Sequence, residues 1–271
     1  MTAAQAEAAR PAVPSPATRI RDALAFEWTK LSSIRSNAWT LLAASAVSIG
    51  SAAIVAQSIA GPKAPPSGVV NPLTAGFLGY AEYGVIPVSI LAVLSFTSEY
   101  SSGLIRTTFT AVPQRLRVLA AKAAVTGGVA LVAGEVLAFI TFFLAQAILA
   151  SHHLGLSVAS PGTLPKVLAA GLLLAVCALI GLGLGAVTRR TPGGIAATIG
   201  VIYLLALLSL VLPHPWNTRI GRFTLPFAAY QLITQHPLTS LFSPGLSLLV
   251  LLAWPVAALL AAAVVLTRRD T

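Results

Sequence analysis

Six long apolar stretches dominate this chain of 271 residues, and they limit the folds that are open to it. A helix that crosses the hydrocarbon core of a membrane needs about 20 consecutive, mainly apolar residues. None of the stretches alternates between apolar and polar residues as a membrane β-strand does, and a backbone in lipid must satisfy its own hydrogen bonds. We therefore expect an all-α integral membrane protein with six transmembrane helices, at residues 38–60, 76–97, 124–150, 165–188, 194–213 and 245–267.

The composition excludes several other classes. Apolar residues make up 56% of the chain and charged residues only 9%, whereas a soluble domain has about 25% charged residues. This excludes a compact cytosolic enzyme, and the high hydrophobicity excludes a disordered chain. The single Cys177 excludes an internal disulfide, and the four histidines form no Cys/His cluster, so we expect no metal site.

Basic residues predict how the chain is oriented. With both termini in the cytoplasm, 4 of the 17 Lys and Arg lie in outer segments, namely Lys63, Lys166, Arg219 and Arg222. The others lie in inner segments, as the positive-inside rule requires. We therefore place both termini inside the cell, in the plasma membrane, and interpret the net charge of +10 as a topology signal rather than as a nucleic-acid-binding surface.

We expect three parts in the chain: a disordered tail at 1–17, a single transmembrane domain at 18–267 and a cytoplasmic tail at 268–271. Within the domain, apolar residues recur at helical spacing over 18–36, with charged residues on other faces, which favours an amphipathic helix lying on the inner membrane surface among the lipid head groups. A cytosolic extension of the first span is the alternative. The residues of interest in this helix are Glu27, Trp28, Lys30 and Arg35.

The outer segment 214–244 contains five aromatic residues, namely Trp216, Phe223, Phe227, Tyr230 and Phe242. Such a segment either dips toward the membrane and lines an outer vestibule, or forms an aromatic belt at the head groups. The sequence leaves both interpretations open.

Glycines predict close helix packing. Gly181 and Gly185 lie four residues apart on one helix face, with Gly183 between them, and Gly127, Gly128 and Gly134 are expected to act similarly in the third span.

Two acidic residues, Glu82 and Glu135, fall within the predicted second and third spans. An ionisable group in lipid costs several kcal/mol unless it is paired, hydrated or protonated. Either these carboxyls line a translocation path, or a protonated carboxyl forms a hydrogen bond between helices.

The chain has no motif for nucleotide hydrolysis. A phosphate-binding loop ends in Gly-Lys-Ser/Thr, whereas the four lysines follow Thr, Pro, Ala and Pro. We therefore expect no enzyme activity, no catalytic residues and no cofactor in this chain. Transport would need an energised partner or an ion gradient.

The polar segment from Thr97 to Arg115 has the sequence TSEYSSGLIRTTFTAVPQR. It resembles the segment that follows the second span in actinobacterial ABC transporter type-2 permeases, where Glu-Tyr, Gly-x-Ile-Arg-Thr-Thr and Ala-x-Pro-x-Arg occur in this order. Phe109 stands where leucine is common in that family. Three further matches are Glu27 to Leu31, Arg35-Ser36 with Trp39-Thr40, and Ala121-Lys122.

The resemblance implies the transmembrane subunit of an ABC exporter that moves a drug-like or lipid-like substrate outward. Two such subunits, identical or homologous, would pair with two separate ATPase subunits that bind ATP and magnesium. The ATPases would dock on the inner segment and on the N-terminal helix. The residues of interest in coupling are Glu99, Tyr100, Gly103, Arg106, Thr107, Thr108 and Arg115.

The residues themselves agree with such a role. A coupling element should be short, polar and held between two spans, as residues 98–117 are. Glu99 and Arg106 could pair with each other or with a partner, whereas Arg115, Arg117 and Lys122 could equally well only set the topology. A gradient-driven transporter that uses Glu135 and a non-transporting membrane scaffold are the alternative functions.

Overall fold

The computed structural model describes residues 16–33, 35–61, 72–79, 84–104, 115–152, 154–235 and 237–268, and in these ranges the chain forms helices and no strands. The helices are α2 (Pro16–Ser33), α3 (Arg35–Ala60), α4 (Pro72–Gly79), α5 (Val85–Ser101), α7 (Arg115–Ala150), α8 (Thr163–Thr188), α9 (Thr191–Ile199), the π-helical turn η2 (Gly200–Leu204), α10 (Leu205–Val211), α11 (Trp216–Gly221), α12 (Leu225–Ile233) and α13 (Pro244–Arg268). The all-helical prediction is confirmed for this part of the chain.

Five helical stretches of the described residues are long and apolar enough to cross a membrane. They are Ala38–Ala60 in α3, α7, α8, the continuous stretch Thr191–Val211 and α13. Each overlaps one of the predicted spans, so the chain is a multi-pass membrane protein by length and composition.

The second predicted span, 76–97, differs from the structure. Residues 76–79 belong to the short helix α4, residues 80–83 lie outside the described part, and α5 runs from Val85 to Ser101 with 17 residues, which is short for a membrane crossing. Pro87 lies in the first turn of α5. Proline has no N–H to donate, so it is well tolerated in the first turn of a helix, where that N–H would have no partner within the helix.

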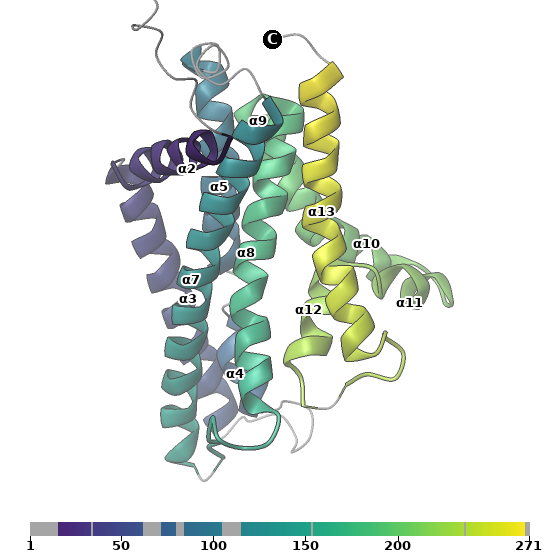
Figure 1. Ribbon diagram of the computed structural model, residues 1–271. Helices are drawn as coiled ribbons and strands as arrows, with labels where there is room; N and C mark the ends of the chain where they lie inside the picture. The colour runs from purple at the N-terminus through teal and green to yellow at the C-terminus, as the bar shows by residue number, and fades with distance from the viewer. Residues whose placement is uncertain are drawn as a thin grey trace, which may run out of the picture.

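Helix α8 lies at the centre of the bundle, against α7, α5 and α13 (Figure 1). Of its most apolar window, 72% is buried, against 39% or less for the other four candidate spans. An element surrounded on all sides needs apolar side chains on every face. Its run of Leu, Ala, Val and Gly meets this need and makes α8 the core of the fold.

Glycines of α8 lie directly against two neighbouring helices, as predicted. A Cβ on Gly181 would lie 2.5 Å from the Ser89 carbonyl oxygen of α5, and one on Gly183 would lie 2.7 Å from the Ala258 carbonyl carbon of α13. In α7, Gly134 abuts the Gly171 carbonyl, whereas Gly128 has nothing within 4 Å. The packing role expected of Gly128 is therefore wrong, because this glycine faces open space.

Helix α2 lies across one end of the bundle rather than in line with α3 (Figure 1). It contacts α7 and α3. This arrangement favours a helix parallel to the membrane surface over a straight extension of the first span.

The segment 214–244 is partly built into the bundle. Helix α12 packs against α13 and α8 and buries Leu225, Ala228 and Ile233. By contrast, Trp216 and Phe223 are about half exposed. The inward-dipping interpretation therefore fits α12, while these two aromatic residues stay at the surface.

We predict that Gly134→Ala destabilises the helix bundle by about 1–3 kcal/mol, because the new methyl group overlaps the backbone of α8 in a tightly packed contact. The measurement is the free energy of unfolding of the purified protein in mixed micelles.

Gly128→Ala is the matched control. It removes a glycine from the same helix without meeting a neighbour, and helix propensity alone should make it neutral or stabilising by up to about 1 kcal/mol. Equal effects of the two substitutions would contradict the assigned packing of α7 on α8.

Candidate functional site

Four charged side chains from three helices meet at the end of the bundle where α2 lies. Glu27 and Lys30 come from α2, Glu99 from the last turn of α5, and Lys122 from the third turn of α7. The Lys122 Nζ donates to Glu27 Oε2 at 2.6 Å and to Glu99 Oε1 at 2.7 Å. Lys30 Nζ pairs with the same Glu99 oxygen. We call these four residues the charge cluster.

Water has little access to the charge cluster. Glu99 is 0% exposed, Lys122 1% and Glu27 6%. Each buried ion costs several kcal/mol of hydration free energy, which only well-placed opposite charges can offset. The order Glu27, Lys122, Glu99, Lys30 alternates in sign and sums to zero, so every ion in it has an opposite neighbour.

Local sequence explains how the charge cluster assembles. Glu27 and Lys30 are three residues apart, so they lie on one face of α2. Glu99 ends the apolar part of α5, and Lys122 follows seven residues after the start of α7, so both lie near the same end of the bundle. The Lys122 ammonium also lies 5.9 Å from the centre of the Phe96 ring.

A second group of contacts joins the same end of the bundle to α13. Arg115 of α7 donates to the Leu266 carbonyl at 2.9 Å, and Arg189 donates to the Val265 carbonyl at 3.4 Å. Cations are favourable at a helix C-terminus, where carbonyls lack partners within the helix. The Arg189 guanidinium also lies over the Tyr100 ring at 5.3 Å.

The predicted coupling residues fall into four groups. Glu99, with Glu27 and Lys30, belongs to the charge cluster, and Tyr100 and Arg115 belong to the second group of contacts. Gly103 has φ of +73° just after α5, a left-handed conformation that favours glycine and ends the helix. Arg106, Thr107 and Thr108 lie outside the described residues, as does Glu82 of the predicted translocation path.

Two predicted residues of α2 and α3 are not part of the charge cluster. Trp28 is 57% exposed, and Arg35 at the start of α3 is also exposed. Surface positions suit contact with lipid head groups, so the interfacial role predicted for them remains a prediction.

The sequence did not predict that Lys122 lies at the centre of the charge cluster. Lys122 was expected either to set topology or to dock a partner, and the structure instead places it between two carboxylates. Two of the seven acidic residues, Glu27 and Glu99, occur near the predicted inner ends of helices. Their position on the predicted cytoplasmic side, where most Lys and Arg residues lie, was the sequence feature that could have indicated buried ion pairs.

Glu135 is half-buried midway along α7 and packs against α8. A Cβ on Gly171 would overlap the Glu135 carboxyl, so the glycine makes room for it. Its Oε2 is buried and has no hydrogen-bond partner among the described residues. The hydrogen bond between helices that we considered for this carboxyl is therefore not formed at that oxygen.

Known proteins provide no independent assignment. No protein-family model matches the chain, and no curated protein matches it either.

Within the described ranges, no group of three His, Cys, Asp or Glu gathers that could hold a metal ion. The charge cluster is thus the part of the described chain where chemistry-bearing side chains are most concentrated.

We predict that Lys122→Met lowers the free energy of unfolding by about 3–5 kcal/mol, because it leaves two buried carboxylates without their shared cation. Lys30→Met should cost less, since the Lys30 side chain is 24% exposed. Denaturant titration of the purified protein in micelles measures both.

Arg117→Met is the matched control, because it removes a positive charge from the same helix, five residues before Lys122. We expect a change within about 1 kcal/mol, because Arg117 is only half-buried and does not belong to the charge cluster. A loss for Lys122→Met no larger than that for Arg117→Met would contradict the role given to the charge cluster.

Proposed function

We propose that this chain is the transmembrane permease subunit of an ATP-driven ABC exporter in the plasma membrane. A separate ATPase subunit docks on residues 98–117, the coupling segment, and on α2. The observation that supports this most is the charge cluster, because it ties α2 to the ends of α5 and α7. These are the two helices between which the coupling segment runs.

The charge cluster makes α2 and the ends of α5 and α7 one mechanical unit. Separating α2 from the bundle would expose or orphan buried ions, at a cost of about 3–5 kcal/mol for a lost partner. A push on α2 is therefore passed to both helices. Helix α7 has 36 residues and is about 54 Å long at 1.5 Å per residue, so a small tilt at this end moves its far end considerably.

The second group of contacts extends this unit to the remaining long helices. Arg115 and Arg189 tie α7 and the end of α8 to the last turn of α13. Thr97 of α5 and Thr191 of α9 share a hydrogen bond of 2.8 Å. Movement at the coupling segment thereby reaches helices on both sides of α8.

The need for a partner follows from the sequence. The chain lacks a phosphate-binding loop, and the resemblance of the coupling segment and of Glu27 to Leu31 to type-2 permeases supplies the class of partner. A second permease copy or homologue would complete the complex. The substrate class that we propose is drug-like or lipid-like.

We predict that Arg106→Glu reduces co-purification with the proposed ATPase partner, and the ATPase rate of the complex, at least tenfold. The coupling segment is where the partner is proposed to dock, and a reversed charge in a docking surface is repelled by the charges that complement the original one. Arg222→Glu, in the segment assigned to the outer side, is the control and should leave both readouts within twofold.

Two results would exclude the proposal. One is ATP hydrolysis by this chain purified alone. The other is modification of a cysteine placed in the coupling segment by an impermeant reagent added outside intact cells, because the ATPase is cytoplasmic.

A gradient-driven transporter is the second candidate, and the Glu135 carboxyl favours it, with a buried oxygen that lacks a hydrogen-bond partner among the described residues. It predicts proton-coupled uptake of a lipophilic fluorescent dye into vesicles without ATP, and Glu135→Gln would abolish this uptake. Two results together would reject this candidate. Dye transport would occur only with ATP and the ATPase, and the Glu135→Gln variant would transport the dye as well as the unmodified protein.

A further inference from the structure

A large apolar cavity lies among α5, α8, η2 with α10, and α12. Its volume is about 800 Å³. Helix α12, which forms one wall, lies toward the end of the molecule opposite α2 (Figure 1). Neither the charge cluster nor Glu135 lines the cavity, so it is separate from the site described above.

Two features of the chain form the cavity walls. The π-helical turn η2 interrupts the helix between α9 and α10 and places Ile202 and Tyr203 on the cavity. π-Helical turns are rare in proteins, and those that occur often lie at functional sites. On the other side, α12 folds back against α8 and contributes Phe227, Tyr230 and Ile233.

One end of the cavity is held in place by hydrogen bonds. The buried Gln231 side chain accepts from the Leu238 N–H at 3.0 Å and donates to the carbonyls of Leu238 at 3.0 Å and Phe242 at 2.9 Å. Leu238 lines the cavity. These hydrogen bonds therefore hold Leu238, after α12, in position as part of the cavity wall.

The lining defines what chemistry the cavity accepts. Every lining residue is uncharged, and the polar side-chain groups are the hydroxyls of Tyr203 and Tyr230 and the thiol of Cys177. A charged or strongly polar ligand would lose its hydration without gaining partners. The volume lies in the range of cavities that hold small ligands, about 300–1,000 Å³.

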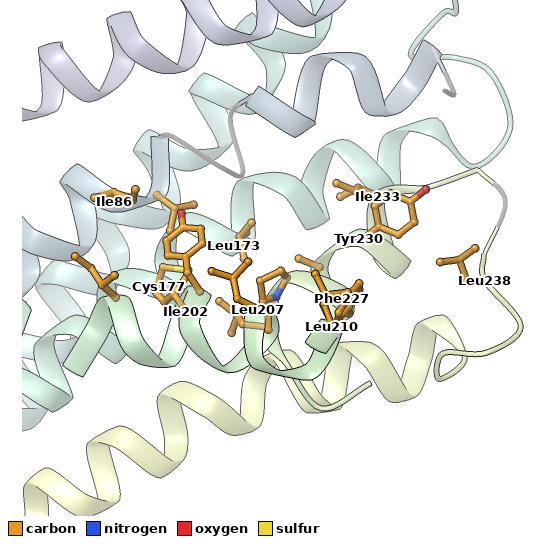
Figure 2. A pocket seen from close by; sticks show the side chains of 17 residues that line it. Ile86, Leu173, Cys177, Ile202, Leu207, Leu210, Phe227, Tyr230, Ile233 and Leu238 are labelled. Atoms are coloured by element: carbon orange, nitrogen blue, oxygen red, sulfur yellow. The ribbon is translucent and has the colours of Figure 1, made fainter. Parts of the chain in front are cut away.

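The arrangement of the lining also suggests an elongated occupant. In Figure 2 the labelled side chains extend in a row from Ile86, past Leu173 and Leu207, to Leu238. Tyr230 lies toward the Leu238 end of this row. A tyrosine presents an apolar ring with a hydroxyl at its tip, which suits the place where a hydrocarbon chain meets a polar head group.

We propose that this cavity binds the hydrocarbon chain of a single-chain amphiphile, with the polar head group at the end formed by Tyr230 and Leu238. The ligand class is a long-chain fatty acid or a lysophospholipid, which share that chain. The proposal stands independently of the proposed transport function, because it needs neither an ATPase nor movement of the bundle.

The test uses the full chain in nanodiscs of diacyl phosphatidylcholine and a palmitate with a photoreactive diazirine near the chain end. After irradiation, mass spectrometry maps the labelled residues. We expect labels concentrated around Ile86, Cys177 and Ile202, at the end of the cavity opposite Tyr230 and Leu238. We expect Leu207→Trp, which places an indole at the cavity wall, to reduce that labelling at least fivefold.

Leu208→Trp is the matched control. Leu207 and Leu208 are neighbours, 58% and 55% exposed, and of the two only Leu207 lines the cavity. Labelling of the control should stay within twofold of the unmodified protein. Because both leucines are at the surface, neither substitution disturbs the buried core, and helical content by circular dichroism checks this for each variant.

Competition experiments distinguish a fatty acid from a lysophospholipid as the source of the bound hydrocarbon chain. Unlabelled palmitate and lysophosphatidylcholine are each added in excess, with octanoate as a short-chain control. Displacement by palmitate alone assigns a fatty acid, displacement by lysophosphatidylcholine alone assigns a lysophospholipid, and displacement by both assigns the shared chain. Displacement by neither, labels spread evenly over the exposed faces of α3 and α13, or equal labelling of the two tryptophan variants would overturn the proposal.

Discussion

A single ammonium group, that of Lys122, holds two carboxylates from two other helices in a place that water hardly reaches. The position of α2 depends on this interaction. The Lys30–Glu99 pair adds a second tie between α2 and the bundle. The large side chains Phe26 and Trp28 of α2 are exposed and bury little area against the other helices. Opposite charges in a medium of low dielectric attract strongly and tolerate little displacement.

The two sides of the bundle are held by different means. On the side of α5 and α7, glycines let backbones approach closely, and ions and hydrogen bonds close the end near α2. On the side of α10 and α12, larger side chains and the π-helical turn keep the helices apart and leave the apolar cavity. The tightly packed side is suited to transmit force, and the looser side is suited to hold a ligand.

Three residues of the charge cluster could be predicted from the sequence, but the ion pairs that join them could not. Glu27, Lys30 and Glu99 were singled out because they lie in the two segments that resemble type-2 permeases. That Glu27 and Glu99 meet at Lys122 could not be deduced, because Lys122 is 95 residues from Glu27 and 23 from Glu99 along the chain. Hydropathy likewise predicted five stretches that the structure shows as helices long and apolar enough to cross a membrane. The second predicted span instead falls on α4, on residues outside the described part and on α5, which has 17 residues.

The sequence by itself determined the class of this protein. Apolar stretches of sufficient length can satisfy their backbone only as helices in lipid, and this holds for each stretch separately. Which helix lies at the centre, which glycines face a neighbour, where α2 rests and where a cavity remains were decided by the tertiary structure. These features depend on which side chains from distant parts of the chain come into contact, and the periodicity of one helix does not contain that information.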